Sequence, residues 1–460
     1  MALPPSPKLS RAETTLRWFR EPYAFLDECR ARHGEVFSFR LLGAPPFVVF
    51  SHPDHVRQIF SDDGSTMAAG AFNRTLAPLL GDRSVLMADG REHVRKRKLL
   101  LPPFHGERMH SYGSAMLEIA DRAIERLPRE RPFAIHPVMQ DVTLEVIVRT
   151  VFGIQAGPRA DEMMRRTKRI LELGAWAPLL LPFLQFELFG LAPYGRFKAA
   201  VAAGDAVLYE EIRRRRETGE RGEDILSLLL DARDDAGAML EPPELRDELV
   251  TLLVAGHETT ATALTWALRW LLDQPGTYAD VRNAVDALGA DPSPEDIAKC
   301  ELLDAAAREA LRLVPVIPLV GRVLLAPASV GGYDLEAGTV VVCSIYLAHR
   351  RPEAFPNPTL FDPSRFVGRK FSAYEFFPFG GGMRRCIGMA FALYEMKLVL
   401  AKLLARTELR LAGPKREIRM VRRSITITPE DGLLVTMRER ALRSAVRGAG
   451  ETGTSREARA

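Results

Sequence analysis

The sequence FGGGMRRCIGMA, at residues 379–390, places a single cysteine at the end of a run of backbone that has few side chains. Three glycines come first, two arginines stand directly before Cys386, and an apolar helical pattern follows. A cysteine can serve as a nucleophile, as half of a disulfide, as a metal ligand or as a small core residue. The rest of the chain has to decide among these four roles.

Composition narrows the choice. The chain has 460 residues, of which 47% are hydrophobic, so it can bury an extensive core in one large domain or a few ordinary ones. A net charge of +4 is too small to indicate nucleic-acid binding, and we find no RNA- or DNA-binding motif. The 4 cysteines are far apart and form no CxxC pair, which argues against a zinc knuckle or a disulfide framework and favours a reducing, cytoplasmic location.

The sequence offers no membrane segment. The N-terminal residues contain no continuous apolar run of the kind found in signal peptides. The most hydrophobic stretch, residues 171–193, contains glutamates and internal prolines. We therefore expect no stable membrane insertion.

The order of hydrophobic patterns predicts a mainly α protein with small β-sheets (α+β). A β-rich opening at residues 35–51 is followed by mostly helical sequence from about 90 to 312, and strand-like pieces return at 338–348 and 424–437. We expect a single domain over residues 1–437. Residues 438–460 lack an apolar pattern, and we expect them to form a disordered C-terminal tail.

A long apolar helix is predicted at residues 247–272, and polar residues interrupt it at its centre. These residues are Gly256, Glu258, Thr259 and Thr260. Burial of an acid and two hydroxyls costs free energy unless these groups have partners or a function. In the plainer interpretation, each threonine bonds back to a carbonyl one turn earlier. Gly256 favours the functional interpretation, because a glycine inside a helix usually marks a close approach.

A second helix, within residues 301–322, carries Glu309 and Arg312 three positions apart on one face. Taken alone, this spacing is most often an ordinary surface ion pair. The segment FDPSRF, at residues 361–366, supplies a further arginine, Arg365, in a turn bounded by proline.

Four segments together resemble the motifs of cytochrome P-450 haem-thiolate monooxygenases, in the family's order and at its usual separations. They are AGHETT (255–260), EALR (309–312), PSRF (363–366) and FGGGMRRCIG (379–388). The resemblance covers about residues 15–437 and looks closest to soluble bacterial members. It implies the cytochrome P-450 fold, a single large domain shaped like a triangular prism, with haem b as cofactor.

By this resemblance, Cys386 is the thiolate ligand of the haem iron, which explains the cysteine that follows the glycine run. Many family members have tryptophan where His93 stands. Glu309, Arg312 and Arg365 would form a buried structural triad. The other haem contacts that the resemblance implies come from His93, Arg97, Ala255, Gly256, Arg322, Phe379, Gly380, Arg384, Ile387 and Gly388.

The resemblance makes Glu258, Thr259 and Thr260 the catalytic set, which would relay protons to dioxygen. Many relatives have aspartate where Glu258 stands. The reaction implied is insertion of one oxygen atom from O2 into a C–H bond, with electrons from NAD(P)H. Two alternatives stay open. A peroxide-driven fatty-acid hydroxylase or decarboxylase generally lacks the acid–alcohol pair, and a non-catalytic haem sensor would need no such pair at all.

The substrate is less well defined. The apolar segment at residues 177–197 falls where the family has a lid over the pocket, although it could equally be packed core. Its composition favours a lipophilic substrate such as a fatty acid, terpenoid or steroid. Arg74 could pair with a fatty-acid carboxylate or simply lie on the surface. The pocket residues we predict are Phe72, Arg74, Val316, Ile317, Leu319 and Ile425.

We find no flavin or iron–sulfur module in the sequence, so we expect electrons to come from a ferredoxin or flavodoxin with its reductase. A cationic docking patch would suit an acidic partner of this kind. The alternative is an ordinary solvated surface. The patch that we predict consists of Arg95, Lys96, Lys98, Arg385 and Lys397.

Overall fold

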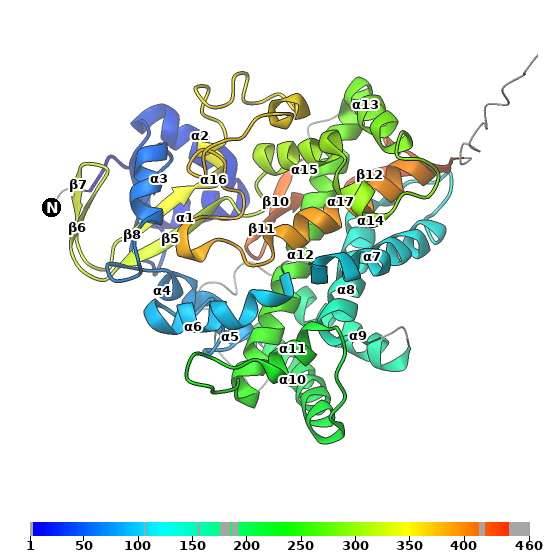
Figure 1. Cartoon of the computed structure of the whole chain (residues 1–460). Coiled ribbons are helices and arrows are strands. Elements are labelled where there is room, and N and C mark those ends of the chain that lie inside the picture. Colours follow the sequence, from blue (N-terminus) through cyan, green and yellow to red (C-terminus); the bar gives the residue numbers. More distant parts are fainter. Residues whose placement is uncertain are drawn as a thin grey trace, which may run out of the picture.

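A helix through the middle of the molecule organises the fold (Figure 1). The computed structural model describes residues 3–104, 107–154, 157–174, 185, 192–413 and 419–440. The central helix, α12 (Pro242–Asp273), begins at two prolines, whose fixed backbone angle suits the first turn of a helix. It carries buried leucines at positions 245, 249, 253, 264, 268 and 271. Within each half of the helix these positions are three or four residues apart, and the step from 253 to 264 is about three full turns, so they form one apolar stripe that faces the core.

The described residues are mainly helical, which confirms the fold class that the sequence predicts. Most helices lie on one side of the molecule, and α9, α10 and α11 project from its lower end in Figure 1. The helices are α1 (Arg11–Arg20), α2 (Pro22–His33), α3 (Pro53–Phe60), α4 (Ala69–Asn73), α5 (Ala77–Leu80), α6 (Gly90–Leu100), α7 (Glu107–Glu125), α8 (Ile135–Phe152), α9 (Pro158–Gly174), α10 (Pro193–Thr218), α11 (Ile225–Asp231), α12, α13 (Pro275–Asp286), α14 (Pro294–Ala298), α15 (Glu301–Leu313), α16 (Ile345–Ala348) and α17 (Met389–Arg406).

Small sheets complete the fold. The largest has the strand order β1-β2-β8-β5-β3; β2 and β8 run parallel, whereas the other neighbours are antiparallel. It lies beside α1, α2, α3 and α16 in Figure 1. The strands are β1 (Phe37–Arg40), β2 (Pro46–Phe50), β3 (Met67–Ala68), β4 (Phe133–Ala134), β5 (Leu319–Leu324), β6 (Ala328–Val330), β7 (Tyr333–Leu335), β8 (Val340–Ser344), β9 (Thr407–Leu411), β10 (Met420–Arg423), β11 (Thr426–Pro429) and β12 (Leu434–Glu439).

The C-terminal boundary differs from the one expected. Strand β12 pairs with β9 as far as Glu439, two residues beyond the predicted domain end at 437. Arg440 then forms an ion pair of 2.6 Å with Asp286 of α13. The rest of the predicted tail, residues 441–460, lies outside the described residues.

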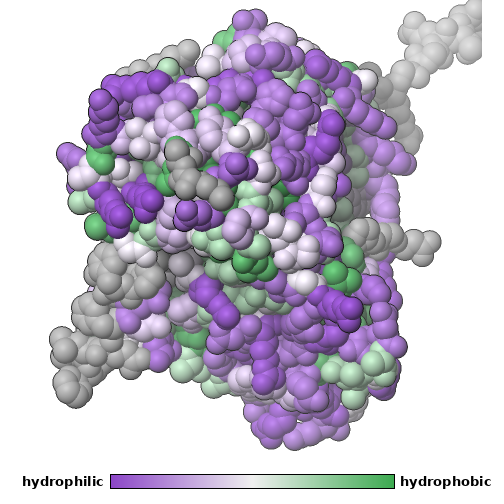
Figure 2. Space-filling view, turned by 90° about the vertical axis from the view of Figure 1, so that its left-hand side faces the viewer, coloured by the Kyte–Doolittle hydropathy of each residue, from purple (hydrophilic) through white to green (hydrophobic). Residues whose placement is uncertain are grey.

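We find no membrane-spanning helix among the residues that the structure describes. None of their helices combines the length and the apolar composition needed to cross a bilayer. The face shown in Figure 2 is mainly hydrophilic, and its hydrophobic residues lie in small patches.

The acid and arginine of α15 form a buried pair. The guanidinium of Arg312 donates to both carboxylate oxygens of Glu309, at 2.7 and 2.8 Å, and both side chains are fully buried. Arg365 lies 3.4 Å from Glu309, which also accepts a hydrogen bond of 2.9 Å from the backbone of Asp362. This geometry is not that of a surface pair, because the buried carboxylate accepts hydrogen bonds from Arg312 and from the Asp362 backbone and lies beside a second arginine, Arg365.

Replacing Arg312 by methionine should destabilise the protein by about 3–5 kcal/mol, because Glu309 would remain buried without its partner. Arg308 offers a matched control on the same helix, since its pair with Asp304 is partly exposed. Arg308→Met should cost about 0–1 kcal/mol. Denaturant unfolding of the two variants checks this, and equal losses would contradict a special role for the buried pair.

Candidate functional site

The loop before Cys386 is shaped by its close approach to α3. Gly380 and Gly382 have φ angles of 67° and 62°, which favour glycine. A Cβ atom at Gly381 would lie 2.1 Å from the Phe60 ring, and one at Gly382 would lie 2.1 Å from the Phe60 carbonyl oxygen. At least part of the glycine run is therefore required by packing against the end of α3.

Cys386 is the accessible one of the four cysteines, since Cys29, Cys300 and Cys343 are buried. Its backbone N–H donates to the Phe379 carbonyl at 2.9 Å, and α17 begins three residues later. Surrounding protein raises the pKa of the Cys386 thiol, while the backbone N–H of Gly388 and the charge of Arg97 oppose that rise. In the core, burial raises the pKa of Cys343 to about 12. Cys386 is therefore the thiol placed to act as a ligand.

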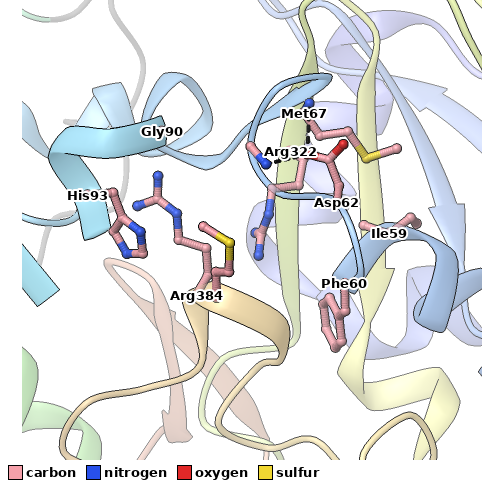
Figure 3. A pocket seen from close by; sticks show the side chains of 10 residues that line it. Ile59, Phe60, Asp62, Met67, Gly90, His93, Arg322 and Arg384 are labelled. Carbon is pink, nitrogen blue, oxygen red and sulfur yellow. Dashed lines mark hydrogen bonds between the residues drawn. The ribbon is translucent and has the colours of Figure 1, made fainter. Parts of the chain in front are cut away.

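Three cationic or potentially cationic side chains meet beside this loop. His93 of α6, Arg322 of β5 and Arg384 line one pocket, and their side chains lie next to one another (Figure 3). Burial and the neighbouring arginines lower the pKa of His93 to about 4, and burial lowers the pKa of Arg384 to about 10. One acid, Asp62, also lines the pocket, and its carboxylate accepts hydrogen bonds from the backbone N–H groups of Gly64 and Met67.

The arginines near this pocket differ in their partners. Arg384 pairs with Asp89 and donates to the backbone carbonyls of Val85 and Ala88. Arg97 and Arg322 make no ion pair with any residue that the structure describes, and burial lowers the pKa of each. His93 Nδ1 is also buried without a hydrogen-bond partner in the described part of the chain. Two carboxylates of a ligand would satisfy these groups.

The residues at the centre of α12 differ in exposure. Ala255 is exposed, and the Thr259 hydroxyl donates to its carbonyl at 2.6 Å, as the plainer interpretation expects. Thr260 is buried. A Cβ atom at Gly256 would lie 2.8 Å from Ile147 Cδ1 of α8, so helix packing alone accounts for this glycine.

Glu258 turns towards α8. Its carboxylate accepts a hydrogen bond of 2.6 Å from the Gln140 side-chain amide, and His136 Nε2 lies 3.7 Å from its other oxygen. Burial raises the pKa of Glu258, although the Gln140 amide and the charge of Arg423 oppose the rise. His136 and Gln140 were not predicted from the sequence. Their spacing of four, which puts them on one face of a helix, was the available signal.

The predicted pocket residues come from several elements. The Phe72 ring packs against Gly321, and Val316 and Leu319 are buried. Ile317 and Ile425 are half-buried. A separate pocket lies between α9, α10 and α12, and its apolar lining includes Leu79, Met163, Ile170, Val201, Val250 and Leu253. Most of the predicted lid, residues 177–184 and 186–191, lies outside the described residues.

Of the two roles predicted for Arg74, the structure agrees with the surface one. Its side chain is 66% exposed and forms an ion pair of 3.1 Å with Asp82. A carboxylate already occupies this guanidinium at the surface, so Arg74 is better described as a surface residue.

The predicted docking patch also needs correction, because two of its lysines are not free surface charges. Lys96 is buried and pairs with Glu244 and Glu248 of α12. The Lys397 side chain is 13% exposed and lies 3.3 Å from Asp304.

The remaining members of the patch differ in exposure and partners. Arg95 is partly buried and pairs with Glu92, Asp234 and Glu244. Lys98 is exposed and pairs with Asp235. Arg385 is exposed and contacts the Met389 sulfur. Only Lys98 and Arg385 therefore remain as exposed cations.

The residues present fit a haem. Cys386 offers an accessible thiol at the N-terminus of α17, whose dipole favours a thiolate. The unpaired arginines and the unpartnered His93 Nδ1 fit the two propionates at the rim of a porphyrin. A fold that combines this thiol, this cationic rim and a long central helix defines a haem-thiolate protein.

Comparison with known proteins agrees. The sequence pattern of the cytochrome P450 family matches residues 4–436. The chain is 40% identical over 412 residues to "Putative cytochrome P450 135B1" of Mycobacterium tuberculosis, which covers 89% of this chain and 86% of that protein. It is 37% identical to "Putative cytochrome P450 135A1" of the same species, over 94% of both chains. The chain belongs to the cytochrome P450 family.

Solved structures share the whole fold, which confirms the predicted cytochrome P-450 architecture. A retinoic acid-bound cyanobacterial CYP120A1 superposes with a TM-score of 0.83 at 26% identity, covering 95% of this chain and 100% of that one. The haem domain of cytochrome P450DA gives a TM-score of 0.84 at 27% identity, over 96% and 98% of the two chains.

Replacing Cys386 by histidine should abolish the strongly red-shifted Soret band that the reduced CO complex of a thiolate-bound haem shows. Cys300→Ser provides a control for loss of a cysteine elsewhere, and it should leave the band in place. An unchanged spectrum in Cys386→His would overturn the assignment of the ligand.

Proposed function

We propose that this protein inserts one oxygen atom from O2 into a C–H bond of a lipophilic substrate, with electrons from NAD(P)H delivered by separate redox proteins. Membership of the family implies a haem monooxygenase. The observation that carries the proposal is the accessible Cys386 thiol together with two arginines, Arg97 and Arg322, that make no ion pair with the residues the structure describes. The four free cysteines suit a reducing cytoplasm, where we propose that the protein acts.

Haem bound to a thiolate supplies the chemistry of O–O cleavage when it is present. The protein has to hold and orient it. Cys386 would provide the thiolate, and Arg97, Arg322, Arg384 and His93 would bind the propionates. Ala255 is the exposed residue of α12 at the turn that also carries Thr259, so this turn would lie over the distal side.

The protein also has to deliver protons. Burial raises the pKa of Glu258, so its carboxyl holds a proton more tightly than an exposed glutamate does. Thr259 stands next to it with a hydroxyl that can both accept and donate. We assign Glu258 as the proton store and Thr259 as the group that passes the proton on. This pair favours oxygen activation over the peroxide-driven alternative.

Replacing Thr259 by alanine should lower the yield of product per NAD(P)H consumed by about one to two orders of magnitude, with the missing electrons recovered as hydrogen peroxide. Substrate binding, read from the haem spectrum, should persist. Thr265 is the matched control, because its hydroxyl makes the same kind of bond to a carbonyl one turn earlier, at 2.8 Å. Full coupling in Thr259→Ala would remove Thr259 from the relay.

A lipophilic substrate is the best match to the apolar residues at the site. The half-buried Ile317 and Ile425, together with Phe72, offer few polar partners, which suits a fatty acid, terpenoid or steroid. One structural neighbour is described as retinoic acid-bound, and retinoic acid is an apolar acid of this class. A screen of such compounds by the spin-state change of the haem, followed by product analysis under labelled O2, tests the proposal. Failure of every compound class to produce labelled product would reject it.

We propose that electrons enter from a ferredoxin or flavodoxin through the exposed cation Arg385. It neighbours Cys386 in sequence, and attraction to an acidic partner would be weakened by salt. Lys98, although paired with Asp235, adds a second exposed cation on α6.

Reversing the charge of Arg385 to glutamate should slow the first electron transfer from reduced ferredoxin by about tenfold at low salt, and less at high salt, because only the steering is lost. The substrate-induced spectral change should stay as in wild type. Arg213→Glu, on α10, is a control for an exposed arginine elsewhere. Equal reduction rates in all three proteins would place the docking surface elsewhere.

A further inference from the structure

The interface between α8 and α12 contains a polar cluster that its packing does not require. The buried face of α8 is mostly apolar, yet His136, Gln140 and Thr143 lie on one face of it, at spacings of four and three. They meet Glu258, His257 and Thr262 of α12. Burial of so many polar groups between two helices is costly unless they are satisfied or used.

The contacts around Glu258 are unequal. Gln140 Nε2 donates to Oε2 at 2.6 Å. Oε1 has no hydrogen-bond partner among the described residues and lies 3.7 Å from His136 Nε2, which is itself 3.4 Å from the Thr262 hydroxyl. One oxygen of the Glu258 carboxyl is thus fixed by a hydrogen bond, and the other lies beside the His136 imidazole without one.

Burial favours the neutral forms of His136 and Glu258. Burial, together with smaller effects of Arg423 and His257, lowers the pKa of His136 to about 3. Burial raises the pKa of Glu258. The groups that face Glu258 are His136 and Gln140 of α8, His257 and Thr262 of α12, Arg423 of β10 and Thr426 of β11. The imidazole of His136 is therefore uncharged at neutral pH, and the Glu258 carboxyl beside it holds its proton more tightly than an exposed glutamate does.

Gln140 has a distinct effect within this cluster. Its amide donates to the carboxylate and so stabilises the ionised form, against the effect of burial. Its hydrogen bond of 2.6 Å also holds the carboxyl against α8. Both effects act on the residue that the proposed function uses as the proton store.

We propose that Gln140 is a positioning residue. Its amide holds the Glu258 carboxyl against α8 and determines how readily Glu258 gives up its proton. The proposal rests on the proposed proton relay. In each transfer, the protonated oxygen of Glu258 would rotate away from His136 and give its proton to the Thr259 hydroxyl. That hydroxyl would pass its own proton on at the same time, and Glu258 would be left as a carboxylate. The Gln140 amide and the Arg423 charge would stabilise this carboxylate until water reprotonates it.

The test uses Gln140→Leu in the haem-loaded protein at rest. The carboxyl C=O infrared band of Glu258, identified by its loss in Glu258→Gln, is titrated against pH without turnover. Loss of the donor should raise the midpoint by about one to two pH units, because a hydrogen bond to a charged group is worth that much. The alkaline fall in product per NAD(P)H consumed should move upwards by the same amount, since Glu258 stays protonated to higher pH.

Thr143→Val is the matched control. It breaks the contact of 3.0 Å between Thr143 and His257 in the same interface and leaves Gln140 untouched. Both midpoints should stay as in wild type. Gln140→Asn, which keeps an amide on a shorter arm, should shift them less than Gln140→Leu does, and it serves if the leucine variant does not fold.

Each outcome discriminates. An unmoved infrared midpoint in Gln140→Leu overturns the proposal and leaves the relay standing. A moved infrared midpoint with an unmoved coupling profile also overturns the proposal, because Glu258 would then lie outside the relay. Full coupling in Glu258→Gln rejects the relay itself, independently of Gln140.

Discussion

The position of Cys386 depends on one buried guanidinium, that of Arg312. Besides Glu309, it donates to the backbone carbonyls of His349, Pro358 and Leu360, at 2.9, 2.7 and 3.0 Å. These bonds fix the irregular chain between β8 and the cysteine loop, where there is no sheet or long helix to do so. The His349 imidazole then accepts the backbone N–H of Phe377 at 3.0 Å, just before the loop begins. An arginine suits this position because its five donors can satisfy several carbonyls and a carboxylate at once.

The opposite side of the site is held by charge rather than by backbone bonds. Lys96 of α6 is buried and pairs with Glu244, and it lies 3.4 Å from Glu248; both glutamates belong to α12. Burial raises the pKa of Glu248 to about 7, which Lys96 and the backbone N–H of Val85 oppose. Because α6 also carries His93, these pairs tie the helix at the proposed propionate side to the helix at the distal side.

Motif order and hydrophobic pattern predicted much of the fold and the core of the site, and the failures have a common physical cause. The spacing of Glu309 and Arg312 fits both a surface pair and a buried one, and only the family motifs favoured burial. Lys96 was predicted to be exposed because its own sequence segment is basic, whereas its partners lie about 150 residues further along the chain. For Arg74 the sequence left both a pocket and a surface position open, and the structure pairs it with Asp82 at the surface. A sequence pattern indicates which residues share a face of a helix, but it does not indicate which residues, distant in the sequence, pack against that face.

The same limit applies to Gly256, which was predicted as a haem contact. Packing also requires it, because a Cβ atom there would meet Ile147, just as one at Gly381 would meet Phe60. A residue can satisfy packing and ligand access together, because the helix or loop that excludes a side chain on one face leaves open backbone on the other. The cysteine loop therefore has its shape before any ligand binds. On this view α3, α8 and α12 do more than enclose the site, because their packing determines which backbone atoms remain accessible next to Cys386 and Thr259.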